Sequence, residues 1–124
     1  MPDTQRARRG HDFLPPAAEL AEIPALYGTE PLKAKDKIVH LHYFIGSSDW
    51  WITELDQAGD AFDTEAWTAF GYMRIGGADL DAEWGYVSLT ELEVITVRAF
   101  VIERDLYWKP GRAQECLPAR AWQL

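Results

Sequence analysis

The strongest structural signal in the chain is the strict alternation of residue types across Lys37–Ile45. Alternation with a period of two predicts a β-strand, because successive side chains of a strand point to opposite faces. One face of this strand carries Val39, Leu41, Tyr43 and Ile45, and the other carries His40, His42 and Phe44. The turn residues Gly46–Asp49 follow, and Trp50–Leu55 has the pattern of a return strand. The two segments therefore predict an antiparallel hairpin.

Further segments complete a sheet and add two helices. Three stretches rich in β-branched and aromatic residues predict strands at Ala66–Ile75, at Trp84–Val87 and around Ala99–Ile102. Short helices are expected at Pro15–Ile23 and Leu89–Ile95, the second with Ser88 and Glu91 in a capping-box pattern. Consecutive strands with short connections favour antiparallel pairing. The sequence therefore predicts an α+β fold, a small antiparallel sheet of about four to five strands with two short helices packed on it.

The length of 124 residues fits a single domain. Residues 15–110 are expected to form this single α+β domain, and residues 111–124 a C-terminal extension beyond it. Residues 1–14 are polar and are expected to form a flexible basic tail. The basic residues of this tail are Arg6, Arg8 and Arg9.

The charge distribution is uneven, although the net charge of the whole chain is only −8. The segment from residue 49 to residue 93 holds eleven acidic residues and one basic residue, Arg74, and so has a net charge of −10. Phosphate binding depends on Lys and Arg side chains, so direct binding of nucleic acid by this segment is disfavoured. An acidic surface of this kind favours basic partners.

Cysteine usage points to a reducing compartment. Cys116 is the only cysteine, which excludes an internal disulfide. The first residues lack the apolar stretch of a secretory signal, and no apolar run approaches the roughly 20 residues that span a bilayer. A cytoplasmic protein is therefore expected. Nothing near Cys116 marks an activated thiol, so a partly buried, unreactive side chain is the favoured interpretation.

His40 and His42 are candidate metal ligands, because they lie two positions apart on one predicted strand face. Asp49 or Glu54 of the return strand is placed to add a carboxylate. A metal site needs three or four converging ligands, however, and the remaining histidine, His11, lies in the predicted tail. Ordinary half-exposed strand histidines are the favoured interpretation, and no cofactor is predicted.

Two other groups of residues have both a functional and a structural interpretation. Trp50 and Trp51 are consecutive, so their side chains point to opposite faces of a strand, and one of them is a candidate surface anchor. Glu103-Arg104-Asp105 fits either a catalytic carboxylate with an orienting arginine or a structural ion pair. The structural interpretation is favoured, because no nucleophile or base can be placed beside the triplet. The chain also lacks a phosphate loop, CxxC, HExxH and a nucleophile elbow.

Five blocks of the chain have a familiar pattern. They are Ile23–Glu30, similar to the opening P-x-L-Y-x-T-E, then Val39–Phe44, Trp51–Asp56, Trp84–Leu92 and Ile102–Pro110. Together the blocks resemble a bacterial family of small proteins of unknown function. The resemblance implies a protein often carried by plasmids, integrated elements and phages, and it transfers no catalytic residues. Several charged residues fall within these blocks, which suits either a shared polar network or a shared site: Glu30, Glu54, Asp56, Glu103, Arg104 and Asp105.

These observations favour a non-enzymatic interaction protein of a mobile genetic element, which presents an acidic surface to a basic, nucleic-acid-binding protein. A more specific form of this hypothesis is anti-defence: the protein inhibits CRISPR or restriction systems of the host by nucleic-acid mimicry. The predicted partner-binding residues are Asp49, Trp50, Glu54, Asp56, Asp60, Asp63, Asp79, Asp81 and Glu83. The alternative is a small-ligand- or metal-dependent enzyme that uses the strand face of His40 and His42.

Overall fold

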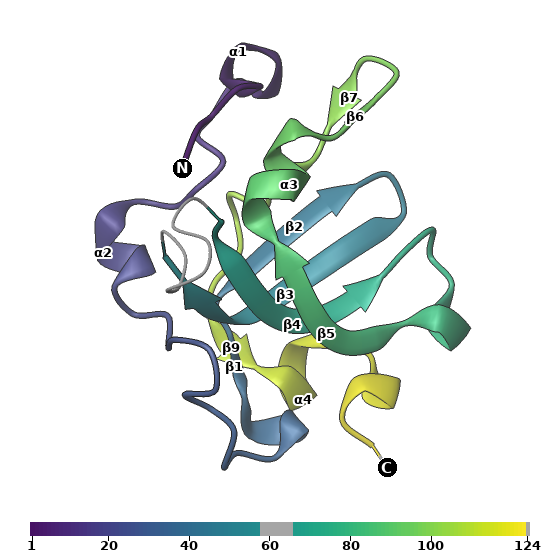
Figure 1. The fold of residues 1–124 in the computed structure, drawn as a ribbon. Coiled ribbons are helices and arrows are strands. Elements are labelled where there is room, and N and C mark those ends of the chain that lie inside the picture. The colour runs from purple at the N-terminus through teal and green to yellow at the C-terminus, as the bar shows by residue number, and fades with distance from the viewer. Residues whose placement is uncertain (58–65, 124) are drawn as a thin grey trace.

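The computed structural model describes residues 1–57 and 66–123 of the chain. It confirms the predicted α+β fold, which is built on one five-stranded antiparallel sheet (Figure 1). The order of the strands across this sheet is β5-β4-β3-β2-β8, so β5 and β8 are its edges. The strands are β2 (Leu41–Ile45), β3 (Ser48–Asp56), β4 (Thr68–Arg74), β5 (Glu83–Ser88) and β8 (Glu103–Arg104).

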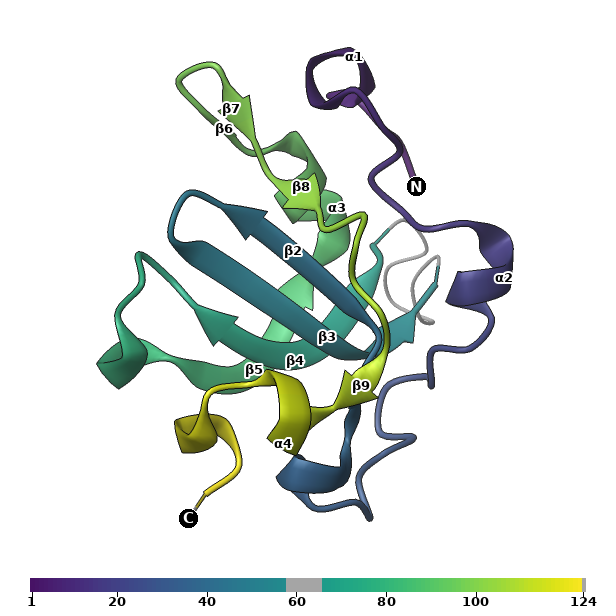
Figure 2. The same ribbon diagram turned by 180° about the vertical axis from the view of Figure 1, so that it is seen from behind.

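Two small two-stranded sheets lie at opposite ends of the molecule (Figure 2). One pairs β1 (Ile38–Val39) with β9 (Gly111–Arg112), next to the C-terminal segment. The other pairs β6 (Thr96–Val97) with β7 (Phe100–Val101) in a hairpin that projects beyond the main sheet. The strand predicted around residues 99–102 therefore exists, but it belongs to this hairpin and not to the main sheet.

The helices are all short. They are α1 (Arg6–Arg9), α2 (Ala17–Leu20), α3 (Leu89–Val94) and α4 (Ala113–Cys116), with 3₁₀ turns η1 (Ala34–Asp36), η2 (Asp79–Asp81) and η3 (Ala119–Ala121). The predicted N-cap of α3 is confirmed, because the Ser88 hydroxyl accepts a hydrogen bond of 3.1 Å from the Glu91 backbone N–H. None of the helices in the described ranges is long and apolar enough to cross a membrane.

Each face of the sheet is covered by its own hydrophobic cluster. The first cluster, which includes Phe13, Tyr43 and Leu89, joins the sheet to the N-terminal segment and to α3. The second cluster, which includes Val39 and Tyr72, is completed by residues of the C-terminal segment: Ala113, Leu117 and Ala121. The predicted C-terminal extension thus contributes core residues, and the indole N–H of Trp84 donates to the Ala121 carbonyl at 2.8 Å.

A β-bulge in β3 decides which of its residues face each cluster. The register with β4 shifts between Ile52 and Glu54, so that Thr53 is the extra residue. Simple alternation would place Glu54 on the same face as Ile52, inside the first cluster. The bulge instead turns Glu54 to the opposite face, where it pairs with Phe70. A Cβ at Gly71, opposite Ile52, would lie 1.8 Å from the Trp51 carbonyl oxygen, so this close approach requires glycine.

The N-terminal residues differ from the predicted flexible basic tail, because they are anchored to the body of the protein. Phe13 is buried in the first cluster, where its ring stacks on Tyr43 with centroids 4.5 Å apart. The Tyr43 hydroxyl donates to the Phe13 carbonyl at 2.8 Å. The expectation failed because a single aromatic residue in a polar stretch gave no periodic signal.

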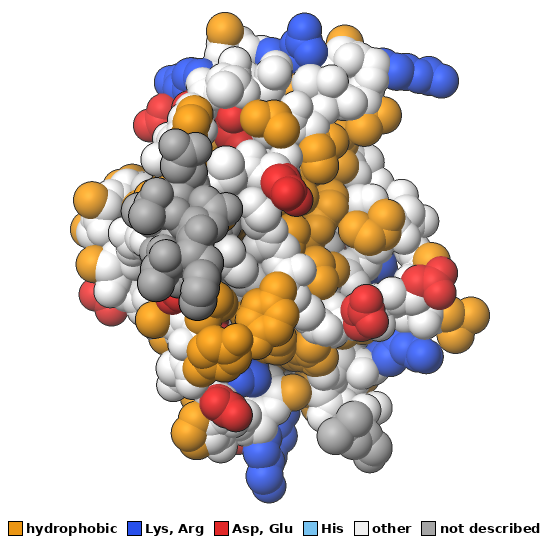
Figure 3. Space-filling view, in the orientation of Figure 1, with side chains coloured by type: hydrophobic (Ala, Val, Ile, Leu, Met, Phe, Trp, Pro, Cys, Tyr) orange, Lys and Arg blue, Asp and Glu red, His pale blue; other side chains and the backbone are white. Residues whose placement is uncertain are grey.

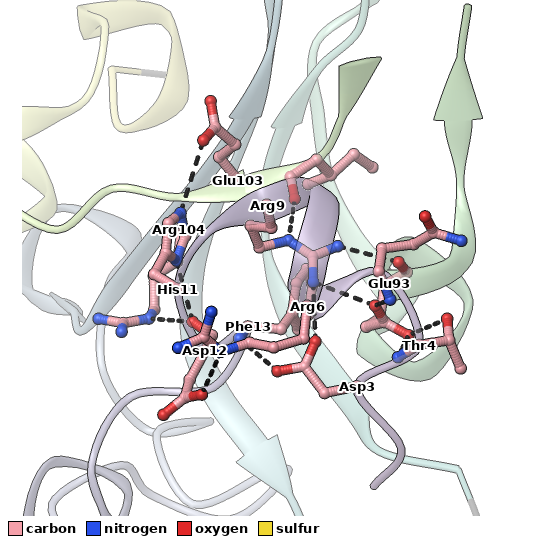
Figure 4. Close-up of polar contacts among 12 residues, drawn as sticks. Asp3, Thr4, Arg6, Arg9, His11, Asp12, Phe13, Glu93, Glu103 and Arg104 are labelled. Carbon is pink, nitrogen blue, oxygen red and sulfur yellow. Dashed lines mark hydrogen bonds and ion pairs between the residues drawn. The ribbon is translucent and has the colours of Figure 1, made fainter. Parts of the chain in front are cut away.

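Arg9 is the polar anchor of this segment (Figure 4). Its fully buried guanidinium donates to the Ile102 carbonyl at 2.7 Å, to the Glu93 carboxylate at 3.0 Å and to Asp3 at 2.9 Å. Glu93 in turn accepts hydrogen bonds from the backbone N–H groups of Thr4 and Gln5, each at 2.9 Å. Of the three arginines of the predicted basic cluster, Arg6 and Arg8 are exposed, whereas Arg9 is structural.

We expect Glu93→Gln to destabilise the protein at pH 7 by about 3 kcal/mol, because it leaves the Arg9 guanidinium buried with Asp3 as its remaining carboxylate. Burial alone raises the pKa of Glu93, but hydrogen bonds from Thr4, Gln5 and Arg9 outweigh it, and the net pKa lies below the ordinary 4.5. A carboxyl group whose pKa is lower in the folded state than in the unfolded state stabilises the fold at pH values above its unfolded-state pKa. This stabilisation is lost as the pH falls through the folded-state pKa.

Urea unfolding of both proteins between pH 7 and pH 3 checks this expectation, with the exposed Glu91→Gln of the same helix as the control. The difference in unfolding free energy between wild type and Glu93→Gln should shrink towards acid pH. A difference that stays constant with pH would contradict the assignment.

Candidate functional site

The predicted acidic surface is divided by the fold into buried and exposed groups. Of the carboxylates predicted to bind a partner, Asp79, Asp81 and Glu83 are exposed, and they lie together on η2 and the start of β5. Asp60 and Asp63 lie outside the described residues. In the space-filling view the acidic side chains of this face stand apart from one another, separated by apolar and neutral surface (Figure 3).

Glu54 is corrected from a surface residue to a buried one, with 3% of its surface exposed. Its carboxylate accepts hydrogen bonds from the backbone N–H groups of Tyr27 at 2.8 Å and Thr29 at 3.1 Å, and from the Thr29 hydroxyl. Asp56 is half-buried and accepts from the Leu26 N–H at 3.0 Å. Both carboxylates therefore hold the loop before β1 against the sheet, and Glu54 is not part of an exposed acidic surface.

Neither tryptophan of the predicted pair is a surface anchor. Trp50 is 7% exposed in the first cluster, and Trp51 is 6% exposed in the second. Their side chains do point to opposite faces of β3, as predicted, but both faces are covered. The sequence argument failed because it assumed that one face of the sheet is open to solvent.

Asp49 is half-buried, and it belongs to a polar chain that runs across the second face of the sheet. Its carboxylate contacts the His42 Nε2 at 2.8 Å and accepts from the Arg74 guanidinium at 3.0 Å. Arg74 also donates to Asp79 at 3.0 Å, and the His42 Nδ1 lies 3.0 Å from Asp105. The imidazole is held between two carboxylates and stacks on Trp51 with centroids 5.3 Å apart. This arrangement fixes the His42 ring as a structural link between strands.

His40 and His42 do not share a metal site. The strand breaks at His40, between β1 and β2, so that Val39 joins the second cluster while Leu41 joins the first. The predicted alternation fails at this point because β1 pairs with β9 outside the main sheet. Among residues 1–57 and 66–123, no three His, Cys, Asp or Glu side chains converge on a position that could hold a metal ion. The two histidines thus lack a ligand set.

His40 does line a small, partly enclosed pocket of about 100 Å³, together with Glu22, Arg104 and Asp105. Burial lowers the pKa of His40, and the nearby charge of Glu22 opposes this shift in part. The ring is therefore neutral at pH 7. The only cysteine gives no further candidate, since burial raises the pKa of the Cys116 thiol and disfavours the reactive thiolate.

The triplet Glu103-Arg104-Asp105 has the contacts of a structural element. Glu103 lies 3.5 Å from the His11 imidazole, and Arg104 donates to the Asp12 carbonyl at 3.3 Å, which ties β8 to the N-terminal segment (Figure 4). Asp105 contacts His42 and accepts from the Tyr107 N–H at 3.0 Å. These contacts link β8 to other segments, but the hydrogen bond from Arg104 to Asp12 is with a backbone carbonyl and not with a carboxylate.

An open pocket of about 240 Å³ lies between the loop held by Glu54 and strands β4 and β5. The residues that line it include Tyr27, Lys37, Phe70 and Tyr86, none of which is among the predicted partner-binding residues. The one signal in the sequence was the position of Tyr27 just before Gly28 in a turn. Tyr27 has a φ of 68°, a left-handed conformation that is uncommon for a tyrosine.

A row of aromatic rings continues from this pocket across the second face of the sheet. Successive rings lie 5.0–6.2 Å apart between centroids, in the order Tyr27, Tyr86, Phe70, Trp84, Tyr72, Trp51 and His42. The C-terminal segment covers the middle of the row, where Trp84 bonds to Ala121. Tyr27 and Tyr86 remain exposed at its end.

Comparison with known proteins places these features in a family. The family model described as "Protein of unknown function (DUF2958)" matches residues 25–115, so the chain belongs to this family. This confirms the resemblance to a family of unknown function. No curated protein and no solved structure matches the chain. The pocket at Tyr27 and the turn between β4 and β5 both lie within the matched residues.

We expect Glu54→Gln to lower the free energy of unfolding by about 3 kcal/mol, because the amide –NH2 would replace one carboxylate oxygen and set a donor against the backbone N–H of either Tyr27 or Thr29. Urea unfolding of wild type and variant measures this loss. Asp81→Asn, which neutralises an exposed carboxylate, is the matched control and should change stability by less than about 0.5 kcal/mol. Equal effects of the two substitutions would refute a structural role for Glu54.

Proposed function

We propose that this member of the DUF2958 family is a non-enzymatic interaction protein, which binds a basic protein partner through the β4–β5 turn and the edge strand β5. The same proposal places it in the cytoplasm as an accessory protein of a mobile genetic element. A nucleic-acid-binding host protein is the proposed partner, and interference with host defence is the sharper form of the proposal.

The observation that carries the proposal is the exposure of Leu80, which is 80% exposed between the exposed carboxylates Asp79 and Asp81. An apolar side chain in this position adds little to the stability of the fold. Flanking acidic groups draw a basic partner by long-range attraction, and the leucine offers apolar contact area once the partner is bound. Glu83 extends the acidic surface onto β5.

The turn is ordered by contacts of its own, which supports binding without a large loss of entropy. Gly76 and Gly77 both have positive φ angles, of 67° and 74°. The Gly76 N–H donates to the Ser48 hydroxyl at 2.9 Å, and Asp79 pairs with Arg74 at 3.0 Å. The first of these contacts holds the turn against the neighbouring β2–β3 hairpin, and the second joins η2 to β4.

The arrangement of the described carboxylates fits a compact contact with a partner better than an extended row of charges that imitates the phosphates of a nucleic acid. Glu54 and Glu93 are buried, and Asp49 is paired with Arg74. The exposed acidic groups at the β4–β5 turn span one turn and the start of one strand. A basic patch of similar size on the partner would complement them.

Catalysis or small-ligand binding at His40 is a second candidate function. The observation that favours it is the partly enclosed pocket of about 100 Å³, in which the His40 imidazole lies near Glu22 and Arg104. A ligand that raises the melting temperature of wild type and not of His40→Ala would support this candidate.

The test of the first proposal is a tagged pull-down from the native host, with nuclease present and mass spectrometry as the readout. Wild type should recover a basic protein in stoichiometric amount, and Asp79→Asn/Asp81→Asn/Glu83→Gln should recover at least about tenfold less of it, because the attraction that steers the partner is lost. The matched control is Glu19→Gln/Glu91→Gln/Glu115→Gln, which changes the net charge equally at other exposed positions. Equal loss in both triple variants would reduce the effect to overall charge, and undiminished capture by the first would sink the proposal.

A further inference from the structure

The pocket of about 240 Å³ beside β5 has an inner half and an outer half with different chemistry. The inner half is formed by Lys37 and Glu54, both buried. The outer half is formed by the rings of Tyr27 and Tyr86, with the exposed Glu30 at the rim. Its volume is below the range of roughly 300–1,000 Å³ of sites for drug-sized ligands, so it suits a single side chain.

The inner charges are already compensated within the chain. The Lys37 ammonium donates to the carbonyl and the hydroxyl of Thr29, at 2.7 and 2.8 Å, and lies 3.9 Å from the Glu54 carboxylate. The same ammonium lies 5.9 Å from the centroid of the Phe70 ring. One aromatic face of the pocket therefore already receives a cation, supplied by the chain itself.

The outer half combines one exposed carboxylate, Glu30, with two exposed aromatic rings, Tyr27 and Tyr86. The pKa of the Tyr86 hydroxyl is raised first by its hydrogen bond with Tyr27, and also by the nearby charges of Glu54 and Glu30. Both carboxylates thus contribute negative potential at the Tyr86 hydroxyl. Tyr27 and Tyr86 are 63% and 51% exposed, with their ring centroids 6.2 Å apart.

The backbone of Tyr27 is strained in a way that exposes this ring. A tyrosine in the left-handed region is disfavoured, and such strain persists only where surrounding contacts impose it. Here the contact is the hydrogen bond from the Tyr27 N–H to the buried Glu54 carboxylate at 2.8 Å. The structure therefore uses a buried acid to hold an aromatic side chain at the rim of a pocket.

From this geometry we infer that the pocket receives an arginine side chain of a protein partner. A guanidinium is planar and weakly hydrated, so it stacks on aromatic faces and donates hydrogen bonds to a carboxylate at the same time. Tyr27 and Tyr86 provide the faces, and Glu30 provides the acceptor. A lysine ammonium has no flat face to stack and is more strongly hydrated, so arginine is the favoured cation.

That the arginine belongs to a basic protein partner rests on the proposed function. Tyr86 lies three residues after Glu83 on the same edge strand, so one partner can reach both the acidic turn and the pocket. The binding chemistry itself is independent of that partner and can be measured with a small probe.

The experiment is a titration of the full-length, ¹⁵N-labelled protein with N-acetyl-arginine amide, followed by NMR. Saturable shifts are expected at the amides of Tyr27, Phe70 and Tyr86, with weaker binding of N-acetyl-lysine amide. Tyr86→Leu should weaken binding about fivefold to tenfold, whereas Tyr86→Phe, which keeps the ring, should retain it. Tyr107→Leu, at a tyrosine that is 93% exposed outside the pocket, is the matched control and should leave binding unchanged.

Four outcomes would overturn the inference. The first three are the absence of saturable shifts at these amides, equal binding by wild type and Tyr86→Leu, and tighter binding of adenosine or another uncharged ring than of the arginine probe. Free arginine binding at least tenfold more tightly than the blocked probe would also overturn it, because the site would then take a small metabolite and not a side chain. If the pull-down recovers no basic partner but the arginine probe still binds the pocket, the proposed function is rejected and the arginine site is not.

Discussion

The fold depends on two buried carboxylates, each of which collects backbone N–H groups from a segment outside the sheet. Glu54 binds the N–H groups of Tyr27 and Thr29, and Glu93 binds those of Thr4 and Gln5. Burying a carboxylate is costly unless its oxygens are hydrogen-bonded, so each contact is worth most when all of its donors are in place. The strands form a sheet through their own pairing, but the loop before β1 and the N-terminal segment depend on these two side chains.

A feature of this fold could be predicted from the sequence where it depends on a local pattern, and could not where it depends on contacts between distant segments. Strands β2 to β5, the β2–β3 hairpin and the Ser88 cap were predictable, because alternation and capping are local patterns. The bulge at Thr53 was not, since it depends on the close approach of Gly71 to the neighbouring strand. Burial of acidic residues was also missed, because composition counts charges but does not show which backbone donors lie nearby.

The burial of some acidic residues changes which part of the acidic segment is available to a partner. Its net charge of −10 suggested a broad acidic surface, yet part of that charge stabilises loops inside the protein. Among the described residues, the surface that we propose for a partner is local: the acidic turn around Leu80 and the aromatic rim formed by Tyr27 and Tyr86. Both adjoin β5, an edge strand of the sheet, and we therefore propose that recognition takes place at this edge.

Site-specific photo-crosslinking in the native host tests this assignment most directly. A photoreactive phenylalanine analogue would replace Leu80, Tyr86 or Tyr107 in turn, all three of which are exposed. We expect positions 80 and 86 to crosslink to the same protein, and position 107 not to crosslink to it. A product from position 107 alone, or no product from positions 80 and 86, would contradict the claim that the β5 edge is the recognition surface.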